Sequence, residues 1–326
     1  MEPFRYERVE EMGGAVAAIG AAPDAKFLGG GTNLVDLMRL GVERPSVLVD
    51  VTRLPFGQID DLPDGGLRIG AGVRNSDLAA DARVRSRFPV LAQALLAGAS
   101  GQLRNFATTG GNLLQRTRCA YFQDVSPPCN KREPGSGCSA IAGEHHNHAI
   151  IGHSEQCVAT HPSDMAVALA ALGAAVQLVG PEGARSIPVV DFHRLPGESP
   201  QRDTVLEANE LITAVDVPPL AFAGRSLYRK VRERASFAFA LVSVAAALDV
   251  VGGEVRDVRI AFGGLAHKPW RAQAAEAVLL GGAADERQFA KAADAEFEQA
   301  DPLRDNAYKV ELARSTLVRT LLELTP

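Results

Sequence analysis

All four cysteines of this chain fall within 39 of its 326 residues, at Cys119, Cys129, Cys138 and Cys157. The surrounding stretch is rich in Gly, Pro, Ser and His. It has no helical or alternating apolar period, so it offers few side chains for a core of its own. A polar loop of this length inside a compact protein needs a reason to be ordered. A metal ion or a cluster held by four thiolates would supply that reason.

The cysteine spacing, Cys-x9-Cys-x8-Cys-x18-Cys, contains no CxxC pair. It matches neither the usual zinc ribbon nor the common ferredoxin patterns. Four thiolates can hold Zn²⁺ or a [4Fe–4S] cluster, and the spacing alone does not choose between them; disulfides and unligated thiols also stay open. Histidines gather in the same region, at His145, His146, His148, His153 and His161. A His-rich segment indicates metal binding, but it is also ordinary in a polar loop.

Composition narrows the class of protein. Apolar residues make up 46% and charged residues 22% of the chain, which is typical of a globular protein of about two domains. The net charge of −5 provides no basic surface for nucleic acid. The longest apolar run, Ala235–Leu248, has 14 residues, fewer than the ~20 that span a bilayer, so it predicts a buried strand and no membrane span. The amino terminus has no secretory signal, so the cytoplasm is the default location.

Two glycine-containing turns are candidate ligand sites. Residues 25–29, 34–40 and 46–51 predict a strand, a helix and a strand, and the sequence GGGTN (Gly29–Asn33) joins the first two. Its glycines would let the backbone approach a ligand, and the helix start would present N–H groups to a nucleotide phosphate. It is neither the GxGxxG nor the GxxxxGK[ST] motif, and a plain tight turn is the alternative. The sequence TTGGN (Thr108–Asn112) could bind the other end of the same dinucleotide.

The chain changes character at Pro218-Pro219, which predicts a domain boundary. Before it, segments 174–179, 185–190 and 211–217 predict strands of a mainly antiparallel sheet, and residues 161–173 predict a helix. After it, the predicted strands cover 225–232, 237–250 and 255–263, and the predicted helices cover 272–280, 286–299 and 306–324.

Four segments in this order carry a family resemblance: FLGGGTNLVDLMR, LRNFATTGGNL, PSD at 162–164, and YRKVRERASFAFALVSVAAAL. Together they resemble the FAD-binding medium subunit of the molybdenum hydroxylases, which include xanthine dehydrogenase, carbon monoxide dehydrogenase and aldehyde oxidoreductases. The resemblance covers essentially the whole chain. With its cysteine insertion, the chain is most similar to the flavoprotein subunit of bacterial periplasmic aldehyde oxidoreductases, which carries an additional [4Fe–4S] cluster.

The resemblance implies an α+β fold with an α/β N-terminal part. A vanillyl-alcohol-oxidase-type FAD-binding domain would cover residues 1–219, in subdomains of about 1–55 and 56–219, with the cysteine-rich insertion at 116–158. Residues 220–326 would form a C-terminal domain of a small antiparallel sheet and helices.

The same resemblance assigns roles to residues, none of them catalytic. The FAD pyrophosphate would be wrapped by Lys26, Phe27, Leu28, Gly29, Gly30, Gly31, Thr32, Asn33 and Leu34. Other contacts to FAD would come from Ala107, Thr108, Gly111, Asn112, Asp164, Ile212 and Lys230. The four cysteines would ligate the cluster. Taken singly, these two charges are better explained as structural residues, Asp164 as a helix cap and Lys230 as a solvated strand residue.

The implied function is electron transfer within an oxidoreductase. Electrons from a molybdenum cofactor on a large partner subunit would pass through [2Fe–2S] clusters on a small partner to FAD on this chain, and then to an external acceptor. The assembly would be a heterotrimer or larger, periplasmic if a partner carries a twin-arginine signal. Alternatives are the flavoprotein of a xanthine dehydrogenase or hydroxybenzoyl-CoA reductase, a Zn-stabilised flavoprotein scaffold, and a free-standing flavin reductase with the same FAD fold.

Overall fold

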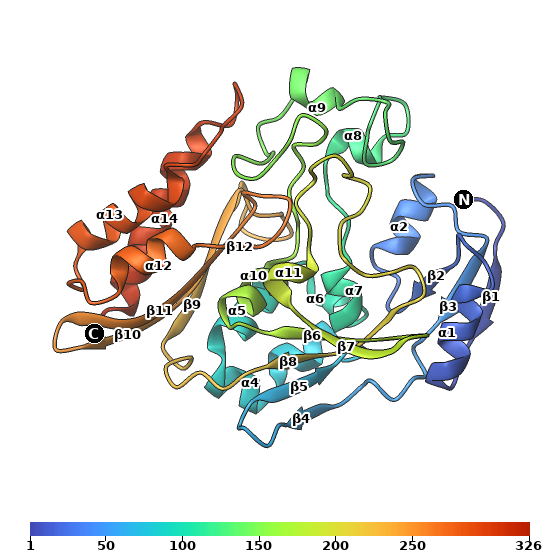
Figure 1. Ribbon diagram of the computed structural model, residues 1–326, viewed down its shortest axis with the longest axis horizontal. Coiled ribbons are helices and arrows are strands. Elements are labelled where there is room, and N and C mark those ends of the chain that lie inside the picture. Colours follow the sequence, from blue (N-terminus) through green and yellow to red (C-terminus); the bar gives the residue numbers. More distant parts are fainter.

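The computed structural model describes residues 1–326 and contains three β-sheets, with helices around them (Figure 1). The first sheet is parallel, with order β1-β3-β2. Its strands are β1 (Arg5–Arg8), β2 (Lys26–Leu28) and β3 (Val47–Asp50), and its helices are α1 (Met12–Gly20) and α2 (Leu34–Arg39). The parallel pairing of β2 with β3 across α2 confirms the predicted strand–helix–strand unit. Strand β1, with the sequence RYER, has no apolar alternation and so gives no strand signal.

The second sheet is antiparallel, with order β4-β5-β8-β6-β7. Its strands are β4 (Ile59–Asp61), β5 (Leu67–Gly70), β6 (Ala175–Gly180), β7 (Gly183–Pro188) and β8 (Leu211–Val217). The accompanying helices are α3 (Asn75–Ala80), α4 (Ala82–Arg87), α5 (Pro89–Ala97), α6 (Gly101–Arg104), α7 (Thr109–Leu113), α10 (Asp164–Ala171) and α11 (Val189–Phe192). The apolar face of this sheet and the central helices α5 and α10 form the largest core of the protein.

The third sheet is antiparallel, with order β12-β11-β10-β9. Its strands are β9 (Ser226–Val231), β10 (Val242–Val251), β11 (Glu254–Gly263) and β12 (Trp270–Arg271). Helices α12 (Gln273–Leu279), α13 (Glu286–Phe297) and α14 (Tyr308–Leu324) pack on this sheet and close a second core (Figure 1). No helix of the protein is both long enough and apolar enough to cross a membrane.

One strand prediction was wrong at its start. The apolar run from Ala235 and the strand predicted from Phe237 begin as irregular chain, and β10 starts only at Val242. Phe237 has a left-handed backbone (φ 51°), and its side chain and that of Phe239 are about half exposed. A left-handed residue interrupts an extended chain, so hydrophobicity alone places the strand too early.

The cysteine insertion has little regular structure, as its composition predicts. It contains two single-turn helices, α8 (Ala120–Gln123) and α9 (Ser139–Ala142), and lies between the first sheet and the C-terminal helices (Figure 1). Its end is held by the C-terminal part of the chain. The amides of Ile150 and Ile151 donate to Leu265 O, and the Asn306 side chain donates to His148 O and Ala149 O. These contacts fix the end of the insertion against the C-terminal part of the chain.

Candidate functional site

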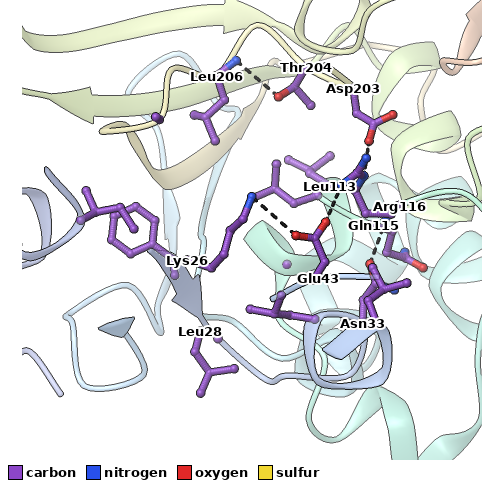
Figure 2. Close-up of a pocket in the computed structure, with 18 of the residues that line it drawn as sticks. Lys26, Leu28, Asn33, Glu43, Leu113, Gln115, Arg116, Asp203, Thr204 and Leu206 are labelled. Carbon is purple, nitrogen blue, oxygen red and sulfur yellow. Dashed lines mark hydrogen bonds and ion pairs between the residues drawn. The ribbon is translucent and has the colours of Figure 1, made fainter. Parts of the chain in front are cut away.

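The main cavity lies where the first sheet meets the second, and its volume is about 490 Å³. All nine residues from Lys26 to Leu34 line it, together with Thr108 and Gly111. Residues 113–116 and the connection at 201–210 complete the wall (Figure 2). A cavity of this size is in the ~300–1,000 Å³ range of small-molecule and cofactor sites.

The glycine turn at Gly29–Asn33 packs against the polar turn at Thr108–Asn112 and the residues just before it. A Cβ atom on Gly30 would lie 1.8 Å from the carbonyl oxygen of Phe106, and one on Gly29 would lie 2.9 Å from Thr108 Oγ1. Gly31 has a left-handed backbone (φ 73°), which a side chain would strain. The glycines thus allow the two turns to touch, and both turns face the same cavity.

Asn33 precedes α2 but does not cap it with its side chain. Its side chain makes no capping bond to α2, and its Oδ1 accepts a hydrogen bond from the backbone N–H of Arg116 at 2.9 Å. Its Nδ2 is buried without a partner in the cavity wall. This side chain therefore fixes the start of the cysteine insertion and leaves one amide donor for a ligand.

Five predicted cofactor contacts lie outside this cavity wall. The Ala107 carbonyl accepts from Asn75 N–H, Asn112 Oδ1 accepts from Ser163 Oγ at 2.6 Å, and Ile212 is buried in β8. Asp164 and Lys230 pair with each other at 2.7 Å beside a small second cavity. Ser163, and not Asp164, caps α10 through a bond to Ala166 N–H. The contact of these five residues with FAD stays a prediction.

A row of charges in the cavity wall has no counterpart in the sequence-based expectations. Lys26, Glu43, Arg116 and Asp203 form successive ion pairs, with N–O distances of 3.8, 2.5 and 2.5 Å (Figure 2). Asp203 also accepts from Lys131 Nζ at 2.5 Å. Burial by itself would raise the pKa of Asp203, but the charges of Lys131 and Arg116 outweigh it and hold that pKa well below its usual range. Single charges far apart in sequence carry no signal that predicts such a row.

The four cysteines line a small cavity of their own, separate from the main cavity and from the one beside Asp164. Their thiols are free and face a common cavity, together with Phe122, Lys131 and Gln156. Cys129 and Cys157 are buried. The backbones of Cys129 and Cys138 pair in an isolated antiparallel β-bridge. Burial raises the pKa of Cys119 to about 11 and that of Cys157 to about 12, so without a cation both remain protonated thiols.

The histidines of the insertion do not join the thiols as a group. Only His148 reaches one, with Nε2 3.1 Å from Cys119 Sγ. His145 and His153 bond to the carbonyls of Ala140 and Asp301 instead. No three His, Cys, Asp or Glu side chains lie close enough together to hold a single metal ion.

Comparison with known families agrees with the cavity geometry. The family model for the FAD-binding domain in molybdopterin dehydrogenase matches residues 2–220, and the model for the C-terminal domain of carbon monoxide dehydrogenase flavoprotein matches residues 226–324. The chain belongs to the FAD-binding medium subunits of the molybdenum hydroxylases. The expected family and fold class are thereby confirmed.

Relatives of this FAD-binding subunit are oxidoreductase flavoproteins. The aldehyde oxidoreductase FAD-binding subunit PaoB of Escherichia coli is 53% identical over 324 residues, which cover 99% of this chain and 98% of that protein. The glyceraldehyde dehydrogenase medium chain of Sulfolobus acidocaldarius is 28% identical, over 85% of this chain and 81% of that one. The solved carbon monoxide dehydrogenase of Hydrogenophaga pseudoflava aligns with a TM-score of 0.77 at 28% identity, over 98% of this chain and 96% of that one.

The residues of the main cavity fit FAD. The side-chain-free turn at Gly29–Gly31 leaves backbone exposed to the cavity, and Asn33 Nδ2 is a buried donor that lacks a partner. An elongated dinucleotide with polar phosphates needs such backbone and amide groups along its length. Residues 26–34, Thr108 and Gly111 would hold it.

Proposed function

We propose that this chain is the FAD- and [4Fe–4S]-containing electron-transfer subunit of a molybdenum-dependent aldehyde oxidoreductase. Electrons would come from a molybdenum cofactor on a large partner subunit and from [2Fe–2S] clusters on a small one, and would leave to an external acceptor. The observation that carries the proposal is the convergence of all four thiols on one cavity beside the FAD cavity. The 53% identity to an aldehyde oxidoreductase subunit supports the substrate class.

Four thiols on one cavity are the ligand set of a four-iron cluster or of a single zinc ion. Four sulfurs on one Zn²⁺, at about 2.3 Å each, would lie about 3.8 Å from one another. All four cysteines line one cavity. A four-iron cluster takes one thiolate per iron and so accepts sulfurs that are farther apart. The Zn-stabilised scaffold is the alternative, and the iron and zinc content of the purified chain decides between the two.

Bound FAD would supply the ability to take up electrons singly and to release them in pairs. The chain itself has to bind, orient and shield the two groups. The turns at Gly29–Asn33 and Thr108–Gly111 would hold one of them, and Cys119, Cys129, Cys138 and Cys157 the other. This task requires no side-chain acid or base, and we name no catalytic residue.

The test is reduction of the purified native complex by substrate. The complex is isolated with its partners, and its flavin and iron–sulfur absorbance are followed after anaerobic addition of an aldehyde. We expect bleaching of both bands and molybdenum in the preparation. Bleaching by a purine, but not by an aldehyde, would assign the subunit to a xanthine dehydrogenase. Return of the bands when an aromatic acyl-CoA is added to the reduced complex would assign it to a hydroxybenzoyl-CoA reductase. A chain that is isolated only alone and reduced directly by NAD(P)H would indicate a free-standing flavin reductase.

A further inference from the structure

The cysteine insertion contacts the wall of the FAD cavity through one buried lysine. Lys131 follows Cys129 by two residues, and its side chain is only 1% exposed. Its Nζ donates to Asp203 Oδ1 at 2.5 Å and to the carbonyl oxygen of Pro200 at 2.7 Å. Asp203 and its neighbours Gln201, Arg202 and Thr204 line the FAD cavity. A shift of the cysteine loop therefore reaches that wall directly.

Asp203 connects Lys131 to the glycine turn at Gly29–Asn33 through Arg116. Its second oxygen pairs with Arg116 Nε, and Arg116 Nη1 pairs with Glu43, each at 2.5 Å. The backbone N–H of Arg116 donates to Asn33 Oδ1, and Glu43 lies 3.8 Å from Lys26 Nζ (Figure 2). The row thus runs from the cysteine loop to both ends of the 26–34 segment. Partly buried ion pairs of this kind are costly to separate, since each one that breaks leaves a charge unpaired.

An apolar contact joins the same two sites beside the ion pairs. Phe122, in the insertion, is buried against Leu37 of α2 and against Cys129. The guanidinium of Arg116 lies over the Phe122 ring, 4.8 Å from its centre. Leu37 lines the FAD cavity, so the two sites share part of their walls.

From these contacts we infer that occupancy of the cysteine site and binding of FAD are thermodynamically coupled, with Lys131 and Asp203 as the positioning residues. This inference rests on the proposed function, because it requires a cluster on the four thiols. A cluster would fix the backbone at Cys129 and so place Lys131 Nζ against Asp203. The FAD wall would then be ordered before FAD arrives, and the ordering cost would no longer reduce its affinity. Linkage makes the effect reciprocal: bound FAD retards loss of the cluster.

The experiment measures the FAD dissociation constant of the full chain in iron-loaded and iron-free forms, by quenching of flavin fluorescence. For the natural sequence we expect the iron-loaded form to bind FAD at least about fivefold more tightly, the lower end of typical coupling. Lys131→Met should bring the ratio of the two constants close to one. Lys131→Arg, which keeps the charge, should restore most of the ratio. A general loss of stability would weaken both forms alike and leave the ratio unchanged.

A matched control is available in the third sheet. Asp249, like Asp203, is shared by two cations, Arg225 and Arg256, but it lies in β10, away from both sites. Arg225→Met removes one cation from a shared carboxylate, just as Lys131→Met does. This control should keep the ratio of the natural sequence.

Three outcomes would overturn the inference. Equal FAD affinity of the iron-loaded and iron-free natural chains excludes coupling, and an unchanged ratio in Lys131→Met excludes this route. If the natural chain holds no iron, both the proposed function and the inference are wrong. If it holds iron but shows no coupling, only the inference is wrong. If the iron-free chain does not stay folded, release of iron to a chelator is timed with and without FAD. We expect FAD to slow release from the natural chain and not from Lys131→Met.

Discussion

Lys230 Nζ lies 2.7 Å from Asp164 Oδ2, and the two side chains are only 4% and 8% exposed. Tyr228 donates from its hydroxyl to the other carboxylate oxygen at 2.5 Å. Asp164 begins α10, whereas Tyr228 and Lys230 belong to β9. The pair thus joins the second sheet's central helix to the third sheet, which gives these residues a structural task beside any contact with FAD.

Removing the positive partner should therefore destabilise the protein. Lys230→Met leaves the Asp164 carboxylate buried without its counter-charge, which typically costs about 3–5 kcal/mol. We expect the urea midpoint of the FAD-free chain to fall accordingly. Combining Lys230→Met with Asp164→Asn removes both charges and should recover part of the loss. A change below about 1 kcal/mol in the single variant would show that the pair is not a structural link.

Gly30→Val should abolish FAD retention, but for a reason that the sequence does not reveal. The motif suggests that a side chain would occupy the pyrophosphate position. In the structure the new Cβ meets the Phe106 carbonyl first, at 1.8 Å, and so forces the two ligand-binding turns apart. Gly13→Ala is the matched control, since nothing lies within 4 Å of a Cβ there. Flavin absorbance of the purified chains measures the effect, and normal flavin content in Gly30→Val would contradict it.

The sequence predicts well where local pattern is enough. The apolar strands at 211–217 and 255–263, the turns at Gly29–Asn33 and Thr108–Asn112, and the irregular insertion follow from hydrophobic period and turn chemistry. The predictions fail where a side chain's role depends on a partner that is distant in the sequence. Asn33 bonds Arg116 instead of its helix, and the Lys131–Asp203 pair spans 72 residues. No local pattern distinguishes such charges from solvated ones.

Stability should fall as the pH is lowered below neutrality. Burial lowers the pKa of His193 to about 4, against about 6.5 for an exposed imidazole. The folded state thus favours the neutral ring, and this stabilisation, complete above pH 6.5, is lost progressively as the pH falls toward 4, by about 1.4 kcal/mol per pH unit. His193→Gln removes the titration, and its urea midpoint should depend less steeply on pH between 6.5 and 4.5. An unchanged slope would mean that His193 does not titrate in this way.

Cys129→Ser should remove or degrade the cluster while FAD stays bound, with lower affinity. The cysteine faces the thiol cavity, whereas the FAD turns are separate segments that it meets only through Phe122 and Lys131. Iron and flavin content of the same preparation measure both effects. Ser126→Ala, in an exposed turn of the same insertion, should change neither. Complete loss of both cofactors from Cys129→Ser would show that the insertion is integral to the FAD cavity.

The most direct test of the account is the stoichiometry of iron, acid-labile sulfide and zinc per FAD in the chain purified without oxygen. The four thiols on one cavity predict about four irons and four sulfides per FAD, no zinc, and a broad brown absorbance that dithionite bleaches. One zinc and no iron per FAD would contradict it.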